Sequence, residues 1–242
     1  MSFMNSLIGG MIGGALGGPL GAVLGAVIGS KFGSKNRKSF SSNQRDQVAF
    51  FAALFACLAK LAKADGVVSR EEVDKVDSYI KERFNFPDDQ RLFAIQIFNQ
   101  AKDDPYTFQD YADQLSSLLS ENKNSLIMFY ELLFELAIAD GVLHDSEEKL
   151  LKEVPFIFGI RSDLFEELKA KFDNQASDAY LVLGVSRDMS FADIKKEYQK
   201  KRREFHPDTL TSKGLPEELL EKAKERFIQI QQAYEEIEKQ KK

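Results

Sequence analysis

Apolar residues recur at helical spacing along most of this 242-residue chain. In two separate stretches an apolar side chain returns every three or four positions, which places these side chains on one face of a helix. The positions are Val48, Phe51, Ala52, Phe55, Leu58, Ala59 and Ala62 in the first stretch, and Leu126, Phe129, Tyr130, Leu133, Leu136 and Ala137 in the second. A further helical pattern occupies the C-terminal part, so the chain is predicted to be all-α.

The N-terminal pattern differs, because Leu7–Gly29 contains no charged residue. As a helix this segment would be roughly 34 Å long, against a hydrocarbon core of about 30 Å. Residues 1–30 are therefore predicted to form a glycine-rich transmembrane helix. Glycine returns at every fourth position, which creates a face without side chains where a second helix packs closely. We expect a homodimer or higher oligomer through this face, formed by Gly9, Gly13, Gly17, Gly21 and Gly25.

Two alternatives for this segment stay open. Glycine is a poor helix former in water, so a disordered tail is one alternative. Pro19 can also kink the helix or turn the segment into a re-entrant hairpin. The apolar residues between the glycines favour the anchor, because a soluble tail gains nothing by exposing them.

The basic residues that follow this segment indicate its orientation. Residues 1–6 carry no Lys or Arg, whereas Lys31, Lys35, Arg37 and Lys38 follow the apolar run. By the positive-inside rule, we expect a single-pass protein of a bacterial inner membrane, with its N-terminus outside and its C-terminal domains cytoplasmic. The same distribution disfavours a cleaved signal peptide. Residues 31–45 are predicted to be a basic, polar linker whose charges determine the orientation of the anchor, with attraction to anionic lipid headgroups as the less favoured alternative.

Residues 46–173 contain an internal repeat with an offset of 75 residues. Ala62–Val68 reads AKADGVV, and Ala137–Leu143 reads AIADGVL. Each copy predicts a helix, a turn at Asp-Gly and a second helix, because a left-handed glycine commonly ends a helix. Ser69-x-x-Glu72 and Asp145-x-x-Glu148 are each predicted to cap the second helix. Two copies suggest a pseudo-symmetric bundle of about seven helices.

This helical repeat resembles the TerB-like domain of tellurite-resistance-associated proteins, an all-α bundle whose acidic residues have been linked to divalent metals. The resemblance raises a possible hard-cation site built from oxygen ligands. The candidates are Asp65, Glu71, Glu72, Asp140, Glu147 and Glu148. We predict no metal, because the EF-hand spacing is absent and acidic residues at helix N-termini are explained by the helix dipole. His144 is expected to be a surface residue near a turn.

Residues 174–242 are predicted to fold as three helices. A short helix over 178–183 ends at Gly184, and Ser190-x-x-Asp193 begins the second helix. Its apolar stripe is Ile194, Tyr198 and Phe205, together with the stem of Lys201. It ends at His206-Pro207, because proline disfavours a helical residue before it. Residues 209–216 are expected to be a loop, and a third helix over 217–239 packs antiparallel to the second.

This C-terminal segment strongly resembles the J domain of DnaJ-type co-chaperones, in which three to four helices carry a His-Pro-Asp motif. The resemblance rests on Tyr180–Val185 (YLVLGV), Ile194–Tyr198 (IKKEY), Ala233-Tyr234 and His206-Pro207-Asp208. The order of anchor, TerB-like domain and J domain resembles the DjlA type of co-chaperone over essentially the whole chain.

The resemblance implies a partner and a contact surface. A DnaK-type chaperone would dock its ATPase domain on the basic second helix, and the His-Pro-Asp loop would accelerate its ATP hydrolysis. The implied contact residues are Lys195, Lys196, Tyr198, Lys200, Arg202, Arg203, His206, Pro207, Asp208 and Phe227. Gln199 and Thr209 depart from the family pattern, where basic residues are frequent. This chain would therefore be a regulator of a partner ATPase and not an enzyme, and no cofactor is expected.

Composition and the other motifs narrow the alternatives. A net charge of −5 disfavours a nucleic-acid-binding protein that uses the basic helix. Cys57 is the only cysteine, so no internal disulfide is possible, and its apolar surroundings predict a buried thiol. A membrane scaffold or tellurite/envelope-stress interaction protein, acting through the TerB-like domain, remains the alternative function. A glycine-lined pore is disfavoured because nothing polar lines the proposed span.

Overall fold

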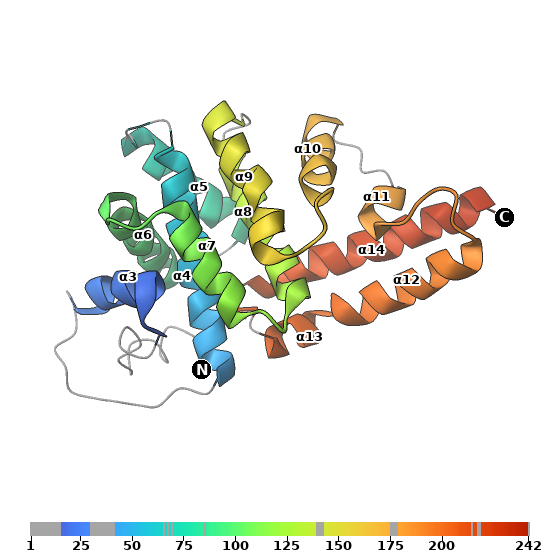
Figure 1. Cartoon of the computed structure of the whole chain (residues 1–242), viewed down its shortest axis with the longest axis horizontal. Coiled ribbons are helices and arrows are strands. Elements are labelled where there is room, and N and C mark those ends of the chain that lie inside the picture. Colours follow the sequence, from blue (N-terminus) through green and yellow to red (C-terminus); the bar gives the residue numbers. More distant parts are fainter. Residues whose placement is uncertain are drawn as a thin grey trace.

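The computed structural model describes residues 16–29, 42–64, 66, 68, 70–84, 86–138, 143–174, 179–213, 215–216 and 219–241. These residues form helices and no strand, as predicted (Figure 1). The helices before the C-terminal segment are α3 (Gly18–Gly29), α4 (Ser42–Ala62), α5 (Arg70–Phe84), α6 (Asp88–Asp103), α7 (Phe108–Leu118), α8 (Lys123–Ala137), α9 (Asp145–Phe158) and α10 (Leu164–Asn174). The remaining helices are α11 (Ala179–Leu183), α12 (Phe191–Glu204), α13 (Pro207–Ser212) and α14 (Leu220–Lys241).

The sequence repeat corresponds to a repeat of three helices. Helix α4 ends at Ala62 and α8 ends 75 residues later, at Ala137. Helix α5 begins at Arg70 and α9 begins 75 residues later, at Asp145. Helices α6 and α10 complete the two copies, and α7 connects them. The bundle of helices α4–α10 thus has the seven helices predicted from the repeat, within the residues that the structure describes.

Helix α4 forms the centre of this bundle. Every residue from Ala49 to Cys57 is fully buried, because α6, α7 and α8 pack around it. A helix that is apolar on all sides requires such surroundings. The Phe50 ring meets the Phe129 ring of α8 edge to face at 5.3 Å, and Phe129 in turn meets Phe158 of α9 at 5.6 Å. Burial also raises the pKa of the Cys57 thiol, as expected for a cysteine that serves as a small apolar side chain.

The capping predictions were right in part. Ser190 accepts a hydrogen bond from the backbone N–H of Asp193 at 3.2 Å and so begins α12. The expected cap at Asp145 was wrong by one residue. His144 is the N-cap of α9, and its backbone N–H donates to Glu147 at 3.1 Å. The other predicted cap, at Ser69, lies outside the described residues.

The N-terminal helix α3 packs against α4, α6 and α7. It buries Leu20, Val23, Leu24 and Val27, which share one face. The expected continuous helix over 7–29 is interrupted at Gly17, because Gly17 and Gly18 both have a positive φ, and α3 begins only at Gly18. The interruption therefore comes from the two glycines, and Pro19 sits in the first turn of α3, where its missing N–H is tolerated.

This break changes the predicted glycine row. Gly17 lies before α3 and is exposed, Gly21 is buried against the bundle, and Gly25 is exposed. These three glycines therefore do not line one continuous helix face in this structure. Gly9 and Gly13 lie outside the described residues. Among the helices that the structure describes, none has both the length and the apolar character needed to cross a bilayer.

The C-terminal domain is an antiparallel hairpin of α12 and α14, with α11 and α13 against it (Figure 1). Ile194, Phe205, Ile230 and Ile237 are buried between the helices. The predicted loop over 209–216 was wrong in its first half, because α13 covers 207–212. His206 caps this short helix and Pro207 occupies its first position, where the fixed φ of proline favours a helix.

Candidate functional site

The His-Pro-Asp motif forms the corner between α12 and α13. Helix α12 ends at Glu204, and His206 has the extended backbone that a residue before proline prefers. Its Nδ1 atom accepts a hydrogen bond from the backbone N–H of Asp208 at 3.3 Å. Pro207 is buried, while the side chains of His206 and Asp208 are 47% and 90% exposed. The corner therefore hides its proline and presents an imidazole and a carboxylate to solvent.

Phe227 of α14 packs against the histidine of this corner. Its ring meets the His206 ring edge to face, with centroids 5.3 Å apart and planes at 80°. Such a pair favours one orientation of the imidazole. The Asp208 carboxylate lies 3.7 Å from His206 Nδ1, and among the described residues it has no closer ion-pair partner. Asp208 is thus available for a charge-assisted hydrogen bond with a partner protein.

An open groove of about 990 Å³ lies beside the corner. Its lining consists of Gln199, Arg202, Arg203, His206, Asp208, Thr209 and Phe227. The structure therefore brings together five of the residues expected to bind a partner. Gln199 and Thr209 had been noted only as departures from the family pattern. Their positions in the sequence could have identified them as groove residues, because Gln199 is one helical turn before Arg203 and Thr209 directly follows Asp208.

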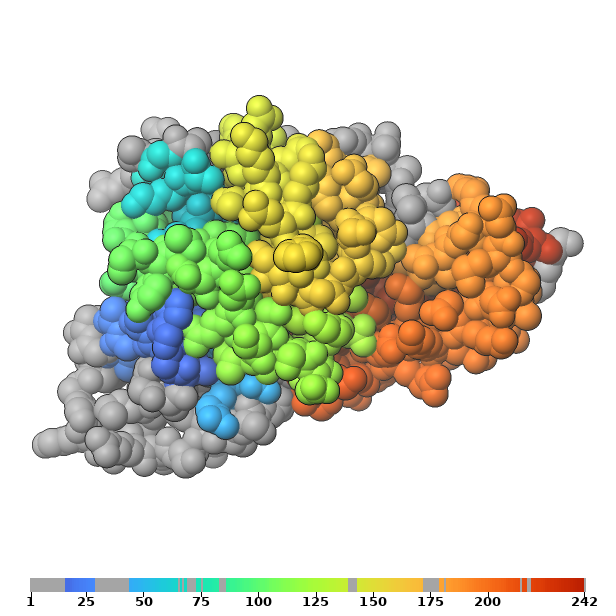
Figure 2. All heavy atoms as spheres, in the orientation of Figure 1, coloured from blue at the N-terminus to red at the C-terminus, as the bar shows by residue number. Residues whose placement is uncertain are grey.

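The other expected contact residues separate into exposed and packed side chains. Lys195, Lys196 and Lys200 are exposed on α12 but do not line the groove. Lys196 pairs with Asp193 at 3.2 Å, and hydrogen bonds from Ser190 and then Lys196 lower the pKa of Asp193. The exposed basic side chains make α12 the positively charged face of the domain, which projects from the bundle in orange in Figure 2.

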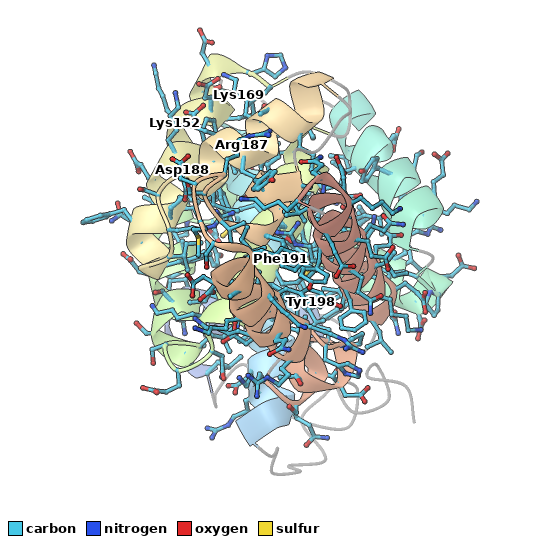
Figure 3. The ribbon with its side chains drawn as sticks, turned by 90° about the vertical axis from the view of Figure 1, so that its right-hand side faces the viewer. Lys152, Lys169, Arg187, Asp188, Phe191 and Tyr198 are labelled. Carbon is cyan, nitrogen blue, oxygen red and sulfur yellow. The ribbon has the colours of Figure 1, made fainter. Side chains whose placement is uncertain are left out.

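Tyr198 is a packing residue more than a surface residue. Its ring stacks on that of Tyr234 with centroids 4.1 Å apart and planes at 8°. The Phe191 ring also stacks on that of Tyr234, with centroids 6.0 Å apart. In Figure 3, Phe191 and Tyr198 lie along α12 on the side that faces α14. Tyr198 therefore fixes the hairpin that carries the basic face.

The acidic residues considered as metal ligands have other partners where the structure describes them. Glu147 accepts from the backbone of His144, and Glu148 pairs with Lys152 at 2.6 Å and Lys169 at 2.7 Å. Figure 3 shows these two lysines side by side above the C-terminal hairpin. Within the described part of the chain, no group of three or more possible ligands surrounds a common point. Asp65, Asp140 and the side chains of Glu71 and Glu72 lie outside that part.

Three family models match the chain in the order expected from its motifs. Residues 1–39 match the co-chaperone DjlA transmembrane domain. Residues 51–170 match the tellurite resistance protein TerB, and residues 178–242 match the DnaJ domain. The His-Pro-Asp corner and its groove both lie within the DnaJ match. No solved structure matches the chain.

Three curated proteins that are similar to this chain are named co-chaperone protein DjlA. The chain is 31% identical to the co-chaperone protein DjlA of Aliivibrio fischeri, over 83% of this chain and 82% of that protein. It is 31% identical to DjlA of Salmonella typhimurium, over 86% of each chain, and 30% identical to DjlA of Vibrio cholerae, over 83% and 81%. Identity at this level over most of both chains shows that this protein belongs to the DjlA family of membrane-anchored J-domain co-chaperones.

Proposed function

We propose that this co-chaperone recruits a DnaK-type chaperone to the bacterial inner membrane and stimulates its ATPase through the His-Pro-Asp corner. One observation carries the proposal. The exposed His206 and Asp208 share a groove with Arg202 and Arg203, which are part of the basic face of α12. A partner bound along α12 would therefore meet the corner at the same time.

The side chains of this protein have separate roles in the proposed encounter. Lys195, Lys196 and Lys200 attract an acidic surface and orient it, because long-range charge mainly sets the encounter rate. The groove then accepts a protruding group between Arg203 and Phe227. Asp208 offers its carboxylate for a charge-assisted hydrogen bond that alters contacts within the partner. The partner supplies ATP and the hydrolytic chemistry.

The N-terminal segment would hold this encounter at the membrane. The four basic residues within 31–38 favour an orientation with the TerB-like and J domains in the cytoplasm, on the same side of the membrane as the proposed DnaK-type partner. The spacing of Gly9, Gly13, Gly17, Gly21 and Gly25 in the sequence is the basis for proposing self-association between anchors in the lipid. Protease treatment of intact spheroplasts tests the orientation. Cleavage of the C-terminal domains without lysis would contradict it.

Single-turnover ATP hydrolysis tests the stimulation directly. The full chain in detergent micelles is added to a DnaK-type chaperone loaded with ATP, and the rate is compared with that of the His206→Gln chain. We expect several-fold stimulation by the first and none by the second. His144→Gln is the matched control, because His144 is an exposed histidine at a helix N-cap in the TerB-like bundle. Equal rates with the parent and the His206→Gln chain would overturn the proposal.

A further inference from the structure

Two buried hydrogen-bond donors of the TerB-like bundle reach the segment that follows the His-Pro-Asp corner. Gln47 of α4 donates through Nε2 to the backbone carbonyl of Leu215 at 3.3 Å. Ser125 of α8 donates through Oγ to the carbonyl of Lys213 at 2.9 Å. Gln47 is 8% exposed and Ser125 is fully buried. Buried polar groups need partners, and here backbone of the J domain provides them.

This segment is itself tied to the corner. The backbone N–H groups of Lys213 and Leu215 donate to the carbonyl of Leu210 at 3.0 and 2.9 Å. Leu210 belongs to α13, which His206 caps, and its side chain is fully buried. Lys213 and Leu215 are therefore both tied to α13 by hydrogen bonds. The bundle thus contacts the corner through one short helix.

Charged side chains continue the contact along α14. Arg226 Nη2 lies 2.9 Å from Glu131 Oε1, and Lys222 Nζ lies 2.6 Å from Glu135 Oε1. Arg226 and Lys222 are one turn apart on α14, and the two glutamates are one turn apart on α8, so the helices pair in antiparallel register. Arg226 also lies 3.6 Å from Glu167 of α10. Arg226 and Lys222 are 5% and 7% exposed.

Buried ion pairs of this kind fix orientation more than they add stability. The desolvation of two charges offsets most of their attraction, whereas a buried charge without its partner is strongly unfavourable. Sliding α14 by one turn in either direction would place one of the two cations opposite the other glutamate and leave the second cation without a facing carboxylate of α8. The pairs therefore select one placement of the J domain among several that its polar surface would otherwise permit.

We propose that the TerB-like bundle is a positioning surface for the His-Pro-Asp corner. The contact, here called the interdomain seam, consists of Gln47, Ser125, Glu131, Glu135 and Glu167 on the bundle, with Lys222, Arg226 and the backbone carbonyls of Lys213 and Leu215 on the J domain. The seam uses the inner side of α14 and leaves the basic face of α12 exposed. It holds the J domain with its partner-binding side outward and does not mask it.

The seam itself is tested by measuring the distance between the two domains in the full chain. Spin labels are placed at Glu153→Cys on α9 and Glu236→Cys on α14, both exposed positions. Cys57 is fully buried and stays unlabelled. We expect one narrow distance distribution in the parent. Arg226→Glu and Glu131→Arg should each broaden it, because each places two like charges opposite each other in the seam.

Controls separate loss of the seam from loss of folding. Glu148→Arg reverses a carboxylate that pairs with two lysines outside the seam, so its distribution should stay narrow. Ser125→Ala removes one seam hydrogen bond with little change of volume, and it should broaden the distribution while helix content is unchanged. A distribution that is already broad in the parent would overturn the proposal. A distance distribution that stays the same in both Arg226→Glu and Glu131→Arg would also overturn the proposal.

The effect on the corner rests on the proposed function and has its own readout. With the full chain and a DnaK-type chaperone, we expect Ser125→Ala and Arg226→Glu to reduce maximal stimulation about two- to fivefold. The concentration for half-maximal effect should change less, because α12 is untouched. Stimulation equal to the parent from a chain with a broadened distance would refute positioning. If the parent itself gives no stimulation, the proposed function fails, and the distance measurement still decides whether the seam exists.

Discussion

The rings of His206 and Phe227 meet edge to face, 5.3 Å apart, so a side chain of α14 orients the exposed imidazole of the corner. Phe227→Ala removes this support and opens the groove that both residues line. We expect the variant to lose about 1 kcal/mol of folding stability, typical of an aromatic pair. Stimulation of a DnaK-type ATPase should fall several-fold in a single-turnover assay.

Ile228 provides the matched control for Phe227. It is the next residue on α14, it is 48% exposed, and it does not line the groove. Ile228→Ala should leave the single-turnover rate unchanged. If both alanine variants reduce the rate equally, α14 has been disturbed as a whole and the ring contact has no separate role.

The basic face of α12 should act through charge. Replacing Arg202 and Arg203 by glutamine removes two exposed cations beside the corner. The concentration of co-chaperone needed for half-maximal stimulation should rise about tenfold at low salt. This difference should shrink towards 0.5 M salt, where charges about 10 Å apart are screened.

A control for the α12 variant lies on the other helix of the hairpin. Lys224 and Lys239 are exposed on α14 and do not line the groove. Lys224→Gln with Lys239→Gln changes the net charge equally. If this control weakens the stimulation as much, overall charge and not the α12 surface controls the encounter.

Much of the fold could be predicted from local patterns. The repeat around Ala62 and Ala137 located both helix ends, because an apolar helix face followed by Asp-Gly leaves few other structures. The α12–α14 hairpin was equally clear, since the buried stripe and the His206-Pro207 stop are both local features. Helix α13 was missed because six residues are too few for a periodic pattern.

The interdomain seam could not be predicted from sequence. Lys222 and Arg226 are spaced like ordinary surface charges of a helix, and Glu131 and Glu135 look like the solvent-exposed side of α8. Only the tertiary structure pairs them. The break at Gly17 was also missed, because a glycine every fourth position is equally compatible with a close helix contact and with a left-handed turn.

A buried ion pair inside the TerB-like bundle should control its stability. Lys60 of α4 lies 2.8 Å from Asp104, and the two side chains are 10% and 8% exposed. Tyr111 also donates its hydroxyl to Asp104, which raises the pKa of the phenol together with burial, the larger cause. Lys60→Met leaves this carboxylate buried without its cation. We expect a loss of about 3 kcal/mol in urea unfolding.

A neighbouring exposed pair offers the comparison for Lys60. Lys63 lies 3.2 Å from Asp103, and these side chains are 42% and 68% exposed. Surface pairs contribute little, so Lys63→Met should cost less than about 0.5 kcal/mol. Similar losses from both substitutions would show that Lys60 is no more important to the bundle than a surface lysine.

The pH dependence of stability should reveal Lys201, the one lysine of α12 that turns inward. Burial lowers its pKa to about 8, and the nearby guanidinium groups of Arg226 and Arg161 add to this, against Glu131 and Glu204. An unfolded lysine keeps its proton to about pH 10.4. Between these two pH values the unfolded chain holds more protons, so stability should rise with pH across this window.

Lys201→Met isolates this contribution because it keeps the apolar stem of the side chain and removes the charge. The free energy of unfolding of the variant should exceed that of the parent by about 1 kcal/mol at pH 7, because the substitution removes a buried positive charge that lies near Arg226 and Arg161. The difference in unfolding free energy between the variant and the parent should disappear as the pH rises from 8 to 10.5, because folded Lys201 in the parent is then neutral. Lys171, whose pKa burial also lowers, contributes equally to both chains and cancels in the difference. Urea unfolding at pH 7, 8, 9 and 10 measures this difference, and curves that stay parallel would mean that Lys201 keeps its proton in the folded protein.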